Sequence, residues 1–286
     1  MPPMKSTSKF VRYSVPSTAT IAALVALTAL TSMGAASCSQ PPPKCTSVRG
    51  DFAATYKLTS PATGECSKLT GDVLGLATYN ASKADGYADF DKASLAIQAE
   101  ALGNFADRAQ AINQPDLDAQ RKLYAFGPFS TAHPSNDFCE VPAMNYGAQQ
   151  NLPALPLIPA KKNDKGEVTE PEVPATVPMN IKYEWSNTRL LVTADAVGTQ
   201  MSADLTYTEN RPGNGGDCTA TYHVVAVYPS VSCADDEGKP DIRLCSPNAN
   251  PDIGMAQGSG LNPDFPITCD PVTLRCVLTE EPPAWK

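Results

Sequence analysis

The chain has 286 residues, of which 22 are lysine or arginine and 30 are aspartate or glutamate, so its formal net charge at pH 7 is −8. Without residues 1–37, which hold three basic residues and no acid, 19 basic and 30 acidic residues remain and the net charge is −11. So acidic a chain lacks the basic surface that binds nucleic acid or anionic lipid headgroups. We therefore expect neither of these functions.

The N-terminal segment has the order of a secretory signal peptide. Residues 1–12 are basic, and the ten residues 21–30 (IAALVALTAL) are apolar. This run is too short for a helix that spans a membrane, which needs roughly 20 residues. The sequence therefore predicts a signal peptide at residues 1–37 and an exported chain.

Small residues lead directly to Cys38. Residues 35–38 (AASC) resemble the lipobox of bacterial lipoproteins, in which the cysteine is lipidated on sulfur and becomes the mature N-terminus. They differ at Ala35, where leucine is commoner, and Ala35-x-Ser37 also suits ordinary signal peptidase. The resemblance implies several acyl chains on Cys38, enough for durable membrane attachment. With Ser39 next, it implies an envelope lipoprotein of Gram-negative bacteria at the outer membrane, on its periplasmic face or at the cell surface.

Residues 38–44 form a short tether, because QPPPK favours an extended chain. A single β-rich domain is expected to follow at 45–286. Alternating apolar residues from Phe52 to Leu58 predict a strand with one buried face, and residues 67–79 are its expected partner. In that partner, Gly71 and Gly75 indicate bulges or places of close backbone approach.

Apolar residues from Leu95 to Ala109 recur at intervals of three and four and predict one helix at 97–112, although residues 94–98 could instead extend a strand. A short strand is expected at 124–129. The segment 152–178 combines six prolines with a charged stretch. It is therefore expected to form a long exposed loop, disordered around 162–169.

The strongest β pattern follows this loop. Residues 179–185, 189–193, 201–207 and 218–228 predict a meander of four antiparallel strands. Residues 229–286 show little periodicity and contain four cysteines. We expect disulfides to hold this C-terminal region against the domain.

The chain has nine cysteines, and a lipid on Cys38 leaves eight, the even number that suits an oxidising compartment. Zinc binding is disfavoured, because the sequence has no C-x-x-C and only two histidines. The connectivity cannot be deduced, but the spacing of these eight, Cys45, Cys66, Cys139, Cys218, Cys233, Cys245, Cys269 and Cys276, favours the pairs 45–66, 233–245 and 269–276, leaving 139–218.

Motifs for catalysis are weak. Ser259 has its glycines adjacent instead of two residues away, so it does not form a hydrolase elbow. His133 is expected to be partly exposed in a loop and His223 to be hydrogen-bonded on a strand, with neither acting as a general base. Gly213, Gly215 and Gly216 precede a strand, so no nucleotide-binding helix follows them.

Two acidic clusters offer oxygen atoms for calcium, but neither follows the spacing of a calcium loop, and solvated turns explain both. Five aromatic residues are candidates for a surface that binds sugar or peptide by stacking, but core packing is the simpler expectation for each. The clusters are Asp85, Asp89 and Asp91, and Asp235, Asp236 and Glu237; the aromatic residues are Tyr124, Phe126, Phe129, Tyr146 and Trp185.

We predict a mainly β fold, an antiparallel β sandwich or distorted barrel with one short helix and four disulfides. The predicted function is that of a non-catalytic envelope protein, structural or ligand-binding, without metal or cofactor. Its contacts, with an envelope protein or a glycan, are expected on loops such as 130–178 and 246–266. Two alternatives are an exported hydrolase with paired carboxylates or a metal in a cleft, and a lipocalin-like carrier with a closed barrel around an apolar cavity.

Overall fold

The computed structural model describes residues 42–104, 123–144, 148–152, 154, 156–175, 177–211 and 216–286. Residues 43–286 form one compact unit. The predicted signal peptide, Cys38, Tyr146 and residues 105–112 of the predicted helix lie outside the described residues. No helix in the described part of the chain is long and apolar enough to cross a bilayer.

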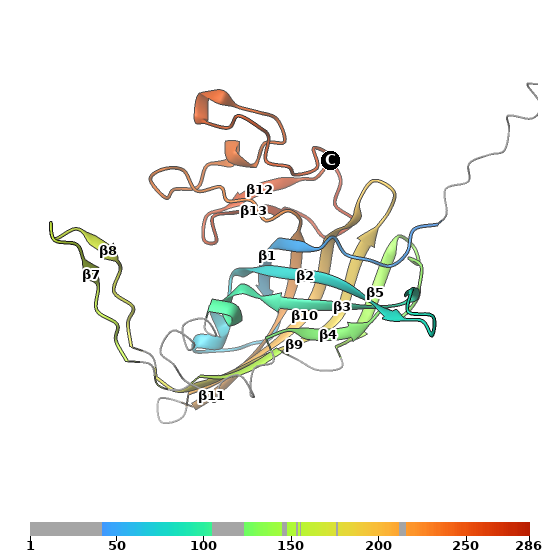
Figure 1. Cartoon of the computed structure of the whole chain (residues 1–286), viewed down its shortest axis with the longest axis horizontal. Coiled ribbons are helices and arrows are strands. Elements are labelled where there is room, and N and C mark those ends of the chain that lie inside the picture. The colour runs from blue at the N-terminus through green and yellow to red at the C-terminus, as the bar shows by residue number, and fades with distance from the viewer. Residues whose placement is uncertain are drawn as a thin grey trace, which may run out of the picture. The chain divides into compact units, whose positions relative to one another are not determined.

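The main sheet has nine strands, and every pair in it is antiparallel (Figure 1). The strand order is β4-β3-β2-β1-β11-β10-β9-β5, and β6 also pairs with β9. The strands are β1 (Gly50–Leu58), β2 (Gly71–Ser82), β3 (Ala88–Ala99), β4 (Ala125–Pro128), β5 (Phe138–Ala143), β6 (Ala148–Leu152), β9 (Met179–Val192), β10 (Val197–Arg211) and β11 (Gly216–Val227).

The inner face of this sheet carries the larger core. Phe52, Ala54 and Tyr56 of β1 point into it, together with alternate residues of the other strands, as the period of two requires. The end strands β4 and β5 come close, since a Cβ on Gly127 would lie 2.8 Å from the Ala143 carbonyl oxygen, but no ladder joins them. Within the described residues the sheet is therefore not closed into a barrel, so the closed barrel of the lipocalin-like alternative is not observed there.

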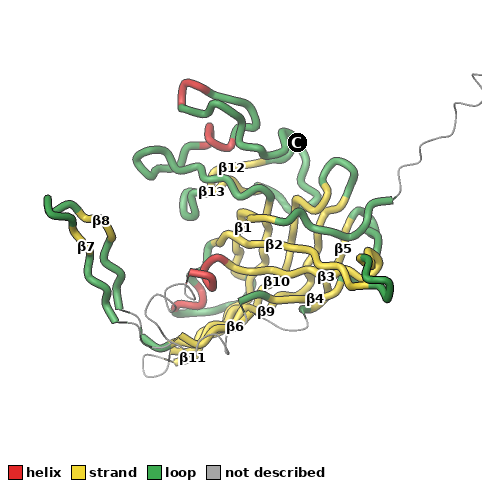
Figure 2. The backbone as a smooth tube through the Cα atoms, in the orientation of Figure 1, coloured by secondary structure: helices red, strands yellow, loops and turns green. Residues whose placement is uncertain are grey.

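A second layer covers part of the outer face. It contains β12 (Ile267–Asp270) and β13 (Arg275–Leu278) and the 3-10 turns Ile242–Cys245 and Pro251–Ile253 (Figure 2). Phe265 and Val277 of this layer belong to one buried cluster with Ala53 and Val227 of the main sheet. The predicted antiparallel β fold with a short helix and disulfides is confirmed.

The helix begins later than predicted. Leu95, Ile97 and Ala99 are all buried on β3, which continues to Ala99, and helical turns start only at residue 100. Asp72 accepts hydrogen bonds from the backbone N–H of Ala101, in the first helical turn, and of Val73. Asp72 therefore caps the start of the helix with a half-buried carboxylate, and burial raises its pKa to about 6.

The predicted strands 179–185 and 189–193 are one strand, β9. The chain continues through Asn187, which has φ 49°, and the ladder to β10 shifts register between Ser202 and Asp204. A bulge of this kind lets a long strand bend without ending. The predicted meander of four strands is therefore wrong, and the meander has three: β9, β10 and β11.

The segment predicted to be a disordered loop tip is a hairpin of β7 (Lys161–Lys162) and β8 (Val168–Glu170). Asn163 closes its turn, because its side-chain oxygen accepts from the backbone N–H of Lys165 and Glu167. A local asparagine turn supplies hydrogen bonds that composition does not reveal. All residues from 161 to 172 are nonetheless exposed.

Four disulfides join the eight cysteines, but every predicted partner is wrong. Cys269 and Cys276 face each other across the β12–β13 ladder. Each bonds elsewhere because the segment around Cys233 hydrogen-bonds beside β13, with Cys233 N–H donating to Leu274 and Cys276 N–H to Val231. The observed pairs are Cys45–Cys139, Cys66–Cys218, Cys233–Cys269 and Cys245–Cys276.

Candidate binding groove on the outer face

A groove of about 620 Å³ lies on the outer face of β1 to β4, beyond the area that the second layer covers. It is continuous with a more polar hollow of about 430 Å³, since Asp51, Gly75 and Gln98 line both. The strand pairing brings these three residues side by side, because Gly75 pairs with Asp51 of β1 and with Gln98 of β3.

Small residues form the floor of the groove. Gly75 and Ala77 of β2 lie beside Ala96 of β3 on this face. A Cβ on Gly75 would meet its nearest neighbours at 3.7 and 3.8 Å, which is ordinary contact. Neither crowding nor backbone conformation demands glycine there, so the missing side chain serves to keep the groove deep.

Aromatic rings form one wall. Tyr79 of β2, Phe126 of β4 and Tyr124 just before it line the groove. The rings of Tyr79 and Phe126 are tilted, with centroids 6.3 Å apart. Tyr79 and Tyr124 are 52% and 47% exposed. Large aromatic rings that stay half-exposed beside a hollow are typical of a ligand-binding surface, where the ligand covers the rings.

Polar groups line the remainder. Arg49, Asp51 and Gln98 border the aromatic part, while Ser230 and Arg275 border the polar hollow. The Ser230 hydroxyl is buried and has no hydrogen-bond partner in the described structure. A buried hydroxyl without a partner is costly, so this hydroxyl lowers stability at the edge of the hollow.

The aromatic residues singled out in the sequence separate into two groups. Tyr124 and Phe126 line the groove, whereas Trp185 is buried in the inner core and Phe129 packs against that core. Tyr79 was missed. Its signal is the outward face of β2, where glycine, alanine and tyrosine alternate with buried leucines in place of charged residues.

Both histidines form hydrogen bonds within the chain. His133 lies in a loop, with Nδ1 2.9 Å from the Pro43 carbonyl oxygen. His223 on β11 contacts Asp204 (3.1 Å) and Glu281 (3.0 Å), so it ties the C-terminal segment to the sheet. Burial lowers the pKa of His223, but hydrogen bonds that its ring donates to the two carboxylates outweigh burial, and the pKa is raised overall.

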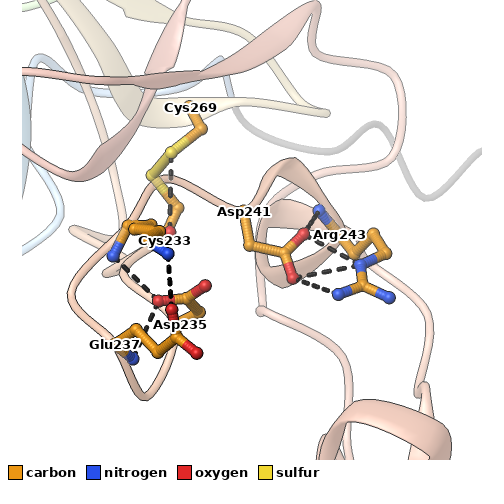
Figure 3. Close-up of polar contacts among 7 residues, drawn as sticks. Cys233, Asp235, Glu237, Asp241, Arg243 and Cys269 are labelled. Atoms are coloured by element: carbon orange, nitrogen blue, oxygen red, sulfur yellow. Dashed lines mark hydrogen bonds and ion pairs between the residues drawn. A yellow bond between two sulfur atoms is a disulfide. The ribbon is translucent and has the colours of Figure 1, made fainter.

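Carboxylates of both acidic clusters accept hydrogen bonds from backbone N–H groups of their own turns. Figure 3 shows Asp235, whose carboxylate accepts from the backbone N–H of Glu237 and Lys239. In the first cluster, Asp85 and Asp89 accept from backbone N–H groups two residues on, and Asp91 pairs with Lys44.

The hydroxyl of Ser259 donates a hydrogen bond to the Cys245 carbonyl oxygen. Within the described ranges, the one cluster of metal-ligating atoms is that of Cys233, Cys245 and Cys276, which are all disulfide-bonded.

Comparison with known proteins gives the class first: the chain is a bacterial envelope lipoprotein, as the sequence predicted. Residues 50–229, more than half of the chain, match the MlpA family model, and the chain belongs to the MlpA family. It is 33% identical over 111 residues to a protein of Myxococcus xanthus that is named "Putative lipoprotein MlpA". The match covers 37% of this chain and 40% of that protein, so the chain spans well under two thirds of its relative.

Proposed function

We propose that this lipoprotein is anchored through Cys38 and binds a saccharide, without transforming it, in the groove on the outer face of β1 to β4. The observation that carries the proposal is the combination of half-exposed rings, a floor of small residues and polar side chains around one hollow. Rings and polar groups in one site give a ligand both packing and orientation.

A saccharide fits this combination better than an apolar ligand. One face of a sugar ring presents C–H groups that pack on an aromatic ring, here Tyr79 or Tyr124. The hydroxyls around its edge need partners, and Asp51, Gln98 and Arg49 supply acceptors and donors beside the rings. In the hollow next to them, Glu100 and Arg275 supply further polar groups.

Binding is tested with Tyr79→Ala in the purified full-length lipoprotein in detergent. Titration calorimetry with a panel of soluble oligosaccharides of hexoses and N-acetylhexosamines should find at least one ligand. For that ligand, the variant should bind about 5- to 10-fold more weakly, the value of one aromatic stacking contact. Tyr87→Ala, which removes an exposed tyrosine outside the groove, is the control and should bind like the wild type.

Equal affinity of Tyr79→Ala and the wild type would place the site elsewhere, and no binding to any oligosaccharide would contradict the ligand class. The hydrolase alternative rests on Asp51 and Glu100, two carboxylates of the polar hollow. We expect the bound oligosaccharide to be recovered intact. Cleavage products that disappear in Asp51→Asn would replace the binding function with a catalytic one.

The anchor itself is tested by metabolic labelling. Cells that express the wild type should incorporate labelled palmitate into the protein, and Cys38→Ala should remove the label, because the cysteine sulfur carries the lipid. The location at the outer membrane, proposed from Ser39, is tested by separating the two membranes on a density gradient. Label retained in Cys38→Ala would contradict the assignment of the anchor.

A further inference from the structure

The β2–β3 hairpin projects past the main sheet and carries two aromatic side chains in water. Tyr87, at the turn, is 74% exposed, and Phe90 on β3 is 56% exposed. From residue 79 to residue 92, every residue except Asp89 is exposed. Exposed rings on this hairpin make no contribution to the core and leave apolar surface free to contact a partner outside the unit.

This hairpin lies where the tether enters the unit (Figure 1). Lys44 forms an ion pair with Asp91 of β3. Phe90 lines a shallow depression together with Pro43, Thr46 and Val197, and Val197 is itself an exposed apolar residue at the start of β10. Phe90 and Val197 therefore flank the first residues of the unit.

The length of the tether limits how far this end can be from the membrane. Five residue steps separate Cys38 from Pro43, and a fully extended chain of that length spans at most about 18 Å. With the sulfur of Cys38 at the bilayer surface, the hairpin is held close to the headgroups whatever path the tether takes.

The charges of the hairpin suit a zwitterionic surface. Three lysines at this end, Lys44, Lys83 and Lys92, balance Asp85, Asp89 and Asp91. The local net charge is zero, so neither attraction to nor repulsion from anionic lipid dominates. Tyrosine is an aromatic residue enriched at the level of membrane headgroups, because its ring is apolar and its hydroxyl polar.

We propose that Tyr87, Phe90 and Val197 form a membrane-contacting surface that inserts into the headgroup region of the bilayer holding the lipid on Cys38. The inference rests on the proposed anchor. The rings supply a second point of attachment, so the unit has a preferred orientation on the membrane and does not rotate freely on its tether.

The experiment uses the full-length lipoprotein in vesicles of zwitterionic phosphatidylcholine brominated near the headgroup. Tyr87→Trp and Phe90→Trp place a fluorophore on the proposed surface, and Val272→Trp places one at an exposed position of the second layer as the control. Quenching by bromine should be at least about twofold stronger for both hairpin variants than for the control, since an interfacial ring is within its reach. The tryptophan emission maximum of both hairpin variants should also lie at a shorter wavelength than that of Val272→Trp.

The vesicles are floated on a density gradient before the measurement, which separates two kinds of failure. Protein that floats while its hairpin tryptophans are quenched no more than Val272→Trp would overturn the inference and leave the anchor intact. Protein that does not float would overturn the anchor and, with it, the membrane-contacting surface. Circular dichroism of each variant verifies that it is folded.

Discussion

Removal of the Cys66–Cys218 disulfide should lower the free energy of unfolding by about 4 to 5 kcal/mol, the value for closing a loop of this length in the unfolded chain. The two cysteines are 152 residues apart in the sequence, the largest separation of the four bridges. Cys66 is also fully buried in the inner core. The bridge therefore restricts the unfolded chain strongly and occupies a packed position in the folded one.

The measurement is guanidinium unfolding of the double variant Cys66→Ala, Cys218→Ala under non-reducing conditions. The matched control is Cys233→Ala, Cys269→Ala, whose bridge spans 36 residues and should contribute roughly 1 kcal/mol less, because the entropy grows with the logarithm of the loop. A smaller loss for the 66–218 variant than for this control would contradict the account.

Gly71→Ala should be the most damaging of the conservative substitutions in β2. A Cβ at this position would lie 2.3 Å from the Ala54 carbonyl oxygen and 2.9 Å from Cγ2 of Thr273. The first neighbour is backbone in the central strand β1 and cannot move alone. Overpacking of this kind costs about 1 to 3 kcal/mol, and we expect the upper end of that range.

Gly75→Ala is the control for that substitution, in the same strand and four residues away. Its Cβ has room, so the free energy of unfolding should stay within about 1 kcal/mol of the wild type, with a small gain from the stiffer unfolded chain. Thermal unfolding of both variants decides the matter. Equal losses in the two would show that Gly71 is not a place of close approach.

The strands with strict alternation could be predicted from the sequence. Phe52, Ala54 and Tyr56 define β1, and Met201, Ala203 and Leu205 define β10, because burial of one sheet face selects every second residue. The break predicted within β9 was wrong. Interruption of the pattern near Asn187 marks a bulge, and the sequence of a bulge does not differ from that of a short turn.

The start of the helix was ambiguous for a physical reason. Leu95 and Ala99 are four residues apart, a spacing that shares one face in a helix and also in a strand. Ile97 between them is also buried, as expected for a strand, in which every second residue shares a face. Residues 95–99 form a strand because β3 pairs with β2 and β4. Local sequence preference alone does not predict this pairing.

The disulfides and the groove depended on tertiary structure in a similar way. Short spacing suggested Cys269–Cys276, but the position of the chain around Cys233 and Cys245 beside β13 determines the partners. The groove brings together residues from β1 to β4 with Ser230 and Arg275. In advance, the sequence pointed only to Tyr124 and Phe126 as candidates for stacking, and these two residues line the groove.

The central place of β1 constrains how this protein reaches its folded state. Ala53 pairs with Val73 on one side and with Val227 on the other, so the second partner arrives late in the chain. Because the chain is synthesised from its N-terminus, the edge of β1 that pairs with β11 stays open until residues 216–227 follow. Contacts of such long range fold slowly, and an unpaired edge invites aggregation. Until β11 pairs with it, the open edge of β1 is therefore the place where we expect the incompletely folded chain to aggregate.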